Sequence, residues 1–114
     1  MNKPVHQQKI IFADSDPVAR DEAELALVKC GFRVTTVENG AMACAMAVRL
    51  VPDLVILDAG LQVQDGCSAC EEIRRLPGTD ELPIVLTIDS DVTGIVDSAL
   101  YAGATDIVVK PVNW

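Results

Sequence analysis

The chain has 114 residues, of which 50% are hydrophobic and 4% aromatic, and it carries a formal net charge of -8 at pH 7. This length allows one domain with a core of its own but excludes a two-domain enzyme. The acidic balance argues against direct binding of nucleic acid or of an anionic membrane, because both partners require a basic surface.

The composition also predicts the fold class and the compartment. Aliphatic residues dominate the hydrophobic part of the chain, which favours an α/β core. No apolar run approaches the roughly twenty residues of a membrane span, and no signal peptide is recognisable, so we expect a soluble, cytoplasmic domain. The four cysteines are then expected to be reduced.

Residues 1–8 form a polar lead-in without apolar periodicity, and we expect this segment to be flexible. It contains the single histidine, His6. No catalytic role is expected for His6, because no nucleophile or metal-ligand pattern lies near it in the sequence. Residues 9–114 are predicted to form the domain.

Strand and helix patterns alternate along residues 9–114. Strands are predicted over residues 9–13, 32–37, 52–58, 83–87 and 106–109, and helices over residues 17–30, 41–50, 66–76 and, after an acidic cap at 89–91, up to residue 102. Asp16-Pro17 is a typical start of a helix, and Asn39-Gly40 turns the chain into the next one. Gly94 falls inside the fourth predicted helix, where glycine costs about 1 kcal/mol relative to alanine.

The stretch from Pro52 to Asp58 carries four successive aliphatic residues and stops on a carboxylate. Such a run, bounded by a proline and by Gly60, is typical of a strand that is buried on both faces of a parallel sheet. Asp58 is therefore predicted at the C-terminal edge of the sheet, where ligands and chemistry collect in open α/β folds. For an isolated aspartate, a helix N-cap or a solvated loop acid would be the simpler interpretation.

The order βαβαβαβαβ has connections that are long enough for right-handed crossovers. It predicts an α/β, flavodoxin-like, doubly wound parallel sheet of five strands in the order 2-1-3-4-5. The final helix that would cover one face beyond the fifth strand is absent from the sequence. We therefore expect exposed apolar sheet on that face, or a homodimer that buries it.

Two helices leave alternatives open. The helix over residues 41–50 has no polar face, so it is either a poorly solvated alanine helix or a partner-binding patch centred on Met42 and Met46. Cys67 and Cys70 have CxxC spacing, but no second pair of ligands completes a zinc site. Buried cysteines that act as small hydrophobic residues are the favoured interpretation.

Charged side chains follow three of the predicted strands. Asp14 and Asp16 come after the first strand, Asp58 ends the third, and Lys110 follows the fifth. Because the carboxyl ends of parallel strands meet at one edge, we expect these side chains to converge. Neighbouring carboxylates that stay ionised favour a divalent cation such as Mg²⁺, and a lysine adds a compensating charge. Phosphoryl transfer uses these same groups, with a carboxylate as nucleophile.

Three motifs occur in order along the chain. They are Asp14 followed by Asp16-Pro17, Leu57-Asp58 followed by Asp65-Gly66, and Gly103-Ala104 leading to Lys110-Pro111. Together they resemble the receiver domain of two-component response regulators, and the resemblance covers nearly the whole length. Any one of the motifs alone would be weak, whereas the set with its spacing is specific.

The resemblance implies that Asp58 accepts a phosphoryl group from the phosphohistidine of a sensor histidine kinase or a phosphotransfer protein. It implies that Asp14, Asp58 and the carbonyl of Gly60 hold Mg²⁺, that Lys110 contacts the phosphoryl oxygens, and that the bond between Lys110 and Pro111 is cis. Such a domain is a signalling module rather than an enzyme, with self-phosphorylation and self-dephosphorylation as its only chemistry. It switches an output domain in the same chain, or a partner.

The chain departs from the family pattern at three positions. Ser15 stands where a second acid usually follows the first strand, so weaker Mg²⁺ binding is expected, because a hydroxyl contributes less than a carboxylate to a hard-cation site. Leu61-Gln62 replaces the family's Met-Pro and loses its rigid proline. Ile107 replaces a residue that is commonly aromatic, so the usual coupling of a hydroxyl to a swinging ring cannot operate.

The switch hydroxyl of the family has two candidate positions here. Counting without gaps from Pro83 to Lys110 puts Ile88 where a threonine or serine is expected, and Thr87 lies one place earlier. A shift of one residue in a strand turns the side chain to the opposite face. We favour Thr87, reached through a shortened strand.

Two other functions remain in view. The departures at Ser15, Gln62 and Ile88 support a degenerate receiver that binds partners or dimerises without phosphorylation. Residues 10–18 also resemble the start of haloacid-dehalogenase-like phosphatases, with Asp14 as nucleophile and Asp16 as acid, although 114 residues hardly accommodate the cap and further motifs of such enzymes. The ending over residues 110–114 resembles receivers that are fused to cyclic-di-GMP signalling domains.

Overall fold

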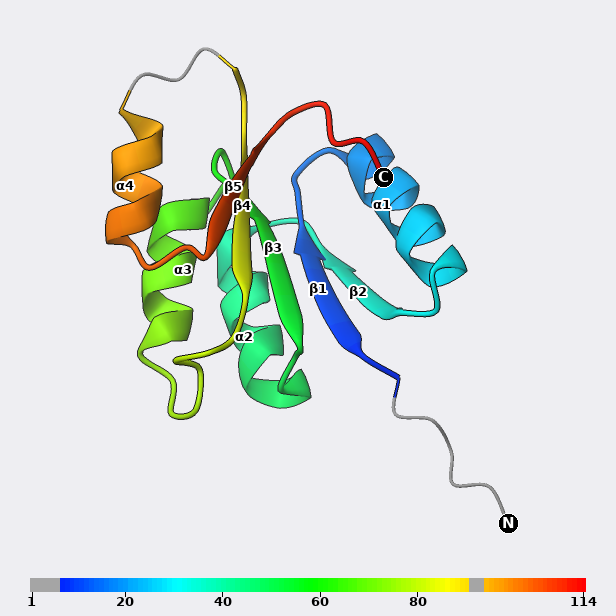
Figure 1. The fold of residues 1–114 in the computed structure, drawn as a ribbon, viewed down its shortest axis with the longest axis horizontal. Coiled ribbons are helices and arrows are strands. Elements are labelled where there is room, and N and C mark those ends of the chain that lie inside the picture. Colours follow the sequence, from blue (N-terminus) through cyan, green and yellow to red (C-terminus); the bar gives the residue numbers. More distant parts are fainter. Residues whose placement is uncertain (1–6, 91–93) are drawn as a thin grey trace.

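Five strands and four helices alternate along the chain, as the sequence pattern predicts (Figure 1). The computed structural model of the chain describes residues 7–90 and 94–114. The strands are β1 (Lys9–Ala13), β2 (Arg33–Val37), β3 (Leu54–Asp58), β4 (Ile84–Ile88) and β5 (Asp106–Val109), and the helices are α1 (Pro17–Lys29), α2 (Gly40–Leu50), α3 (Gly66–Arg74) and α4 (Ile95–Tyr101). The predicted lead-in and His6 fall largely on residues outside this description.

All the strand pairs are parallel, and the order β2-β1-β3-β4-β5 confirms the predicted flavodoxin-like topology. Parallel pairing places the carboxyl ends of the strands at one edge of the sheet, which is the upper edge in Figure 1. The register pairs Asp58 at the end of β3 directly with Thr87 of β4. The residues that were predicted to converge therefore start from one edge of the sheet, at the ends of β1, β3 and β5.

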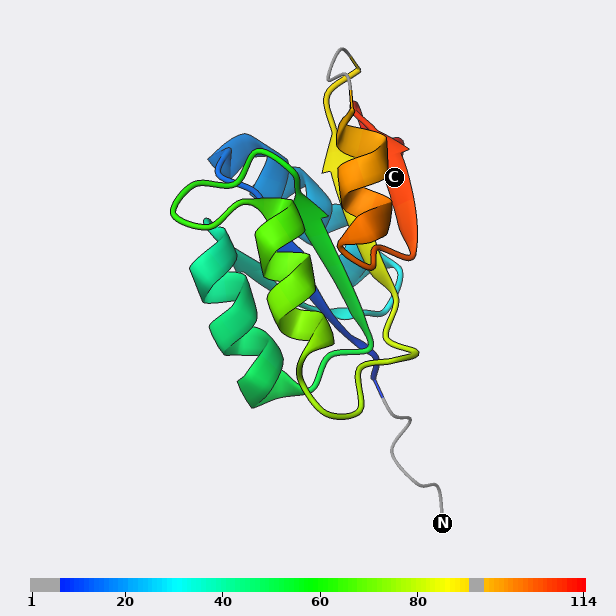
Figure 2. The same ribbon diagram turned by 90° about the vertical axis from the view of Figure 1, so that its left-hand side faces the viewer.

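The helices form a layer on each face of the sheet. Helices α2, α3 and α4 lie on one face and α1 on the other (Figure 1), and α2 and α3 run side by side (Figure 2). Alternation along β3 explains this layering, because Val55 and Leu57 enter the core under α2, α3 and α4, whereas Ile56 joins the cluster under α1. Asp58 shares the α1 face with Ile56.

The α1 face is only partly covered. Helix α1 packs on β1 and β2, and among the described residues no further helix lies on this face. Leu54 and Val85 are accordingly half-buried members of the cluster under α1. Self-association through this part of the sheet stays a prediction.

The predicted position of Gly94 in a helix interior is wrong. Helix α4 begins at Ile95, and Gly94 is its N-cap with a φ of 81°, a left-handed conformation that no interior helical residue adopts. The prediction that Asp91 takes part in the cap concerns a residue outside the described part of the chain. The fourth helix is therefore a short one of 7 residues.

Helix α2 has the apolar outer face that its sequence predicts. Asn39 caps it by accepting a hydrogen bond from the N–H of Met42 at 2.9 Å. Met46 packs against the core, whereas Met42 is 42% exposed. A binding patch centred on both methionines stays a prediction, with Met42 as its more exposed member because Met46 is partly buried.

No helix in the described ranges is both long and apolar enough to cross a membrane.

Candidate functional site

Three charged side chains meet at the carboxyl edge of the sheet. The ammonium Nζ of Lys110 lies 2.6 Å from Oδ1 of Asp58 and 3.2 Å from Oδ2 of Asp14. Both carboxylates are nearly buried, with 2% of Asp14 and 8% of Asp58 exposed. The lysine thus bridges two acids that would otherwise repel each other in a poorly solvated site.

The charge balance around Lys110 appears in its pKa. Burial alone would lower the pKa of this ammonium group, but the hydrogen bond and negative charge of Asp58, followed by those of Asp14, raise it above its ordinary value. Lys110 is therefore fully protonated at neutral pH. The peptide bond from Lys110 to Pro111 is cis, as the family resemblance implies.

Two further groups hold the carboxylate of Asp58. The hydroxyl of Thr87 donates to Oδ1 at 3.1 Å, and the backbone N–H of Gly60 donates to Oδ2 at 3.2 Å. The structure places the Thr87 hydroxyl, itself buried, at the acid, whereas Ile88 belongs to the opposite face of β4 because side chains alternate along a strand. Of the two candidate switch positions, Thr87 is the one that contacts Asp58.

The loop between β1 and α1 holds Asp14 in place. Oδ1 of Asp14 accepts from the N–H of Asp16 at 2.9 Å, and the backbone carbonyl of Asp14 accepts from Nη1 of Arg20 at 2.8 Å. Asp16 uses its own carboxylate to cap α1, accepting from the N–H of Val18 at 3.0 Å. Ser15 is exposed between them.

The oxygen ligands at this edge suit a hard cation, although few of them are charged. Oδ2 of Asp14 is buried and accepts no hydrogen bond, despite its ion pair with Lys110. Carboxylate and carbonyl oxygens are the ligands that Mg²⁺ prefers. In the ranges 7–90 and 94–114, however, no three side chains of His, Cys, Asp or Glu gather closely enough to hold a metal. Ser15, which follows Asp14 directly, supplies no carboxylate at this edge.

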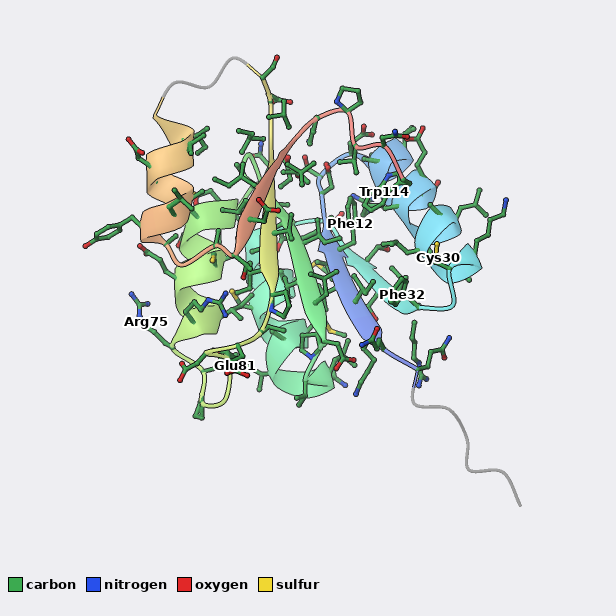
Figure 3. All side chains as sticks on the ribbon, in the orientation of Figure 1. Phe12, Cys30, Phe32, Arg75, Glu81 and Trp114 are labelled. Carbon is green, nitrogen blue, oxygen red and sulfur yellow. The ribbon has the colours of Figure 1, made fainter. Side chains whose placement is uncertain are left out.

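A cavity of about 400 Å³ adjoins these residues. Asp14, Thr87 and Lys110 line its polar side, and Phe12 and Trp114 line its apolar side. The two rings meet edge to face, with their centroids 5.8 Å apart (Figure 3). The cavity is therefore large enough to admit a group of several atoms beside Thr87 and Lys110, the two residues that contact Asp58.

One glycine of the site has a role that its motif alone does not explain. A Cβ on Gly66 would lie 2.4 Å from the backbone oxygen of Asp58, so α3 begins in direct contact with the end of β3. The N–H of Gly66 also donates to the carbonyl of Ala59 at 3.2 Å. The sequence signalled Gly66 only as part of the Asp65-Gly66 spacing, and the close backbone approach explains why a side chain is not accommodated there.

The cysteines do not form a metal or disulfide site. Cys70 is buried and donates from Sγ to the carbonyl of Ala102 at 3.4 Å, and Cys67 is half-buried. All four thiols are free, and Cys30 is exposed at the end of α1 (Figure 3). Interpreting the CxxC pair as packing residues agrees with these positions, and Cys30, the C-cap of α1, faces solvent.

We expect one thiol to react rapidly with a disulfide reagent at about pH 8, because only the thiolate is reactive. Burial, followed by the hydrogen bond and then the charge of Glu72, raises the pKa of Cys44 to about 12, and burial is the main cause that raises the pKa of Cys70 to about 11. Burial, followed by Asp65, raises the pKa of Cys67 as well. The fast phase should belong to Cys30 and disappear in Cys30→Ser. A fast phase that survives this substitution would contradict the burial of the other thiols.

Comparison with known proteins gives a consistent result. The family model described as the response regulator receiver domain matches residues 10–114. The transcriptional regulatory protein AfsQ1 of Streptomyces coelicolor is 37% identical over 106 residues, which cover 91% of this chain and 45% of that protein. The response regulator PleD of Caulobacter vibrioides is 34% identical over 82 residues, covering 72% of this chain and 18% of that protein. The chain thus spans less than half the length of these curated relatives.

A solved structure agrees with the sequence relatives. The receiver domain of the sensor histidine kinase PA1611 from Pseudomonas aeruginosa superposes with a TM-score of 0.86 at 32% identity, covering 95% of this chain and 88% of that one. That structure is described as having a magnesium ion coordinated in its active-site cleft.

Proposed function

This chain belongs to the response regulator receiver domain family of two-component systems, and we propose that Asp58 is its phosphoacceptor. The observation that carries the proposal is the set of groups that contact the Asp58 carboxylate. It ends a central strand beside a cavity and contacts the Lys110 ammonium, the Thr87 hydroxyl and the Gly60 amide. These donors can hold a carboxylate nucleophile and stabilise the negative charge of a phosphoryl group that is transferred to it.

In the proposed reaction, a carboxylate oxygen of Asp58 forms a bond to phosphorus while the bond from phosphorus to the donor's imidazole nitrogen breaks. The donor is the phosphohistidine of a sensor histidine kinase or a phosphotransfer protein. Lys110 then contacts one phosphoryl oxygen. The hydroxyl of Thr87 exchanges its hydrogen bond to the Asp58 carboxylate for one to a second phosphoryl oxygen. The ion pair between Lys110 and Asp58 supports this role, because it already places the cation at the acceptor.

Asp14, Asp58 and the carbonyl of Gly60 would hold Mg²⁺, which supplies charge neutralisation for the transferred group. Oδ2 of Asp14 supports this assignment, because it is buried and accepts no hydrogen bond in addition to its ion pair with Lys110. Ser15 is expected to weaken the affinity, because the site has one carboxylate fewer than the family pattern.

The proposal is tested by incubating the chain with Mg²⁺ and a small phosphodonor and measuring its intact mass. We expect the mass of one phosphoryl group to be added, and Asp58→Asn to abolish the gain completely. Asp80→Asn is the matched control, since Asp80 is an exposed aspartate in the loop between α3 and β4. A wild-type chain whose mass does not change would overturn the assignment.

A second candidate is a degenerate receiver that recognises partners without phosphorylation. Two observations favour it, namely the exposed Ser15 in place of an acid and the lysine that already forms ion pairs with both Asp14 and Asp58. The half-covered α1 face would then be the surface for a second copy or a partner. The mass measurement separates the two candidates. The phosphatase alternative gains no support, because Asp16 caps α1 with the carboxylate that such an enzyme would use as an acid.

The domain is proposed to act in the cytoplasm as a signalling module that controls an output domain in the same chain or a separate partner. One relative is a transcriptional regulatory protein of which this chain matches 45%. Nucleic acid contact, where it exists, is therefore assigned to another part of such a protein, in line with the acidic charge here.

A further inference from the structure

The loop of residues 59–65, between β3 and α3, contains a strained turn close to the site. The N–H of Gln64 donates to the carbonyl of Gln62 at 2.7 Å, across the single residue Val63, whose φ is 66°. This is a γ-turn with positive φ, the rare and strained form. Val63 is β-branched and 84% exposed, so no packing of its side chain explains the conformation. Other contacts of the loop must hold it.

The first of these contacts is with the start of α2. Gln62 forms an isolated parallel bridge with Asn39, and its carbonyl also accepts from the N–H of Gly40 at 3.5 Å. A Cβ on Gly40 would lie 1.9 Å from the backbone oxygen of Gln64, so the loop rests directly on the backbone of this glycine. Any side chain at Gly40 would push the turn away.

The second contact is the side chain of Gln64, which connects two helices. Its amide nitrogen donates to Oγ of Ser68 at 3.2 Å and to Oε1 of Glu72 at 3.4 Å, both on α3. Its amide oxygen accepts from Sγ of Cys44 on α2 at 3.8 Å. The turn is thus fixed from both sides.

The backbone of Gly60 and Leu61 connects the turn to the carboxylate of Asp58. Leu61 is buried in the main core, and its N–H donates to the carbonyl of Asp58 at 3.4 Å. The preceding residue is Gly60, whose N–H holds Oδ2 of Asp58. Leu61 is the single residue between Gly60 and Gln62, so a displacement of Gln62 reaches the Gly60 peptide through the Leu61 backbone.

We propose that Gly40 and Gln64 are positioning residues that fix the Gly60 peptide against Asp58 by holding the strained turn over residues 62–64. They replace the rigidity that the family's proline supplies at the position of Gln62. The part of this inference that concerns phosphorylation rests on the proposed function, whereas the part that concerns the Gly60 amide does not.

The test compares Gly40→Ala and Gln64→Ala with Ala47→Gly. Ala47 is buried at the other end of α2, so its substitution destabilises the same helix without touching the loop. Gln64→Ala removes only side-chain contacts and keeps the test valid where Gly40→Ala does not fold. Hydrogen exchange of the Gly60 amide, followed by NMR without a phosphodonor, is the first measurement. We expect faster exchange in both loop variants, relative to core amides of the same sample, and not in Ala47→Gly.

The second measurement is the rate of phosphoryl gain at several donor concentrations. The limiting rate should fall roughly 10- to 100-fold in the loop variants, with little change in the half-saturating donor concentration, because misplacement affects the reacting geometry rather than binding. Exchange at Gly60 that is no faster than in Ala47→Gly would overturn the proposal. A wild-type chain that takes up no phosphoryl group refutes the proposed function instead, and the exchange result still decides the positioning role.

Discussion

Replacing Lys110 by methionine is expected to lower the free energy of unfolding by about 2 kcal/mol at neutral pH, below the roughly 3–5 kcal/mol measured for fully buried pairs. The substitution keeps most of the side-chain volume but leaves Asp14 and Asp58 facing each other without a cation. The effect is smaller than in a fully buried pair because 28% of the lysine side chain is exposed, which allows water to screen part of the charge.

Urea unfolding provides the measurement, with Lys29→Met as the control for loss of an exposed lysine. The control should change stability by no more than about 1 kcal/mol. Adding Asp14→Asn to Lys110→Met should recover much of the loss, because it removes one of the two opposed charges. Equal stability of the two methionine variants would show that the bridge contributes nothing.

The pH dependence of this difference has a definite sign. The pKa of Lys110 is raised in the folded state, since Asp58 and Asp14 outweigh the burial of the ammonium group. Its contribution is therefore fully present below the unfolded pKa, near 10.4, and is lost as the pH rises through the higher folded value. Titration of Lys110 should accordingly leave the difference in stability between the wild type and Lys110→Met unchanged up to about pH 10. Above that pH the difference should shrink.

Replacing Ser15 by aspartate is expected to raise the affinity for Mg²⁺ on the order of tenfold, which corresponds to about 1.4 kcal/mol. Ser15 directly follows Asp14, so the new carboxylate adds a charged oxygen ligand beside two existing ones. Without the metal, the same charge should slightly destabilise the chain, since it joins Asp14 and Asp16 in one loop. The gain in affinity and the loss of metal-free stability thus have one electrostatic cause.

Calorimetric titration with Mg²⁺ measures this effect, and Ser98→Asp is the matched control. Ser98 is exposed on α4, which lies on the opposite face of the sheet from α1, so it adds the same charge away from the site (Figure 1). Its Mg²⁺ affinity should remain that of the wild type. An equal rise in both variants would mean that overall charge, rather than a ligand next to Asp14, controls the binding.

The strands and their order follow from the sequence because each hydrophobic run is short and is bounded by a turn residue. The stretch that ends on Asp58 shows this, since its alternation fills both core clusters and its last residue reaches the sheet edge. The meeting of Asp14, Asp58 and Lys110 follows in turn from parallel topology. Local pattern and global fold agree at these positions.

Other features depend on contacts between segments that are distant in the sequence. The choice between Thr87 and Ile88 required the register of β3 on β4, which counting along one chain does not supply. The γ-turn at Val63 contradicts the preference of a β-branched residue, and only the approach of Gln64 to Gly40 accounts for it. Gly94 resembled a residue inside a helix, whereas its positive φ marks the helix start.

The contact between Phe12 and Trp114 makes the site observable by fluorescence. Trp114 is the single tryptophan of the chain, and the residue is 45% exposed where it lines the cavity with Asp14 and Lys110. Phe12 lies two residues before Asp14 on the same strand face, so β1 positions both the aromatic pair and the acid. Tryptophan emission, excited selectively at a wavelength that tyrosine does not absorb, therefore comes from this one place, and its intensity and wavelength are expected to follow events at the carboxyl edge without an added dye.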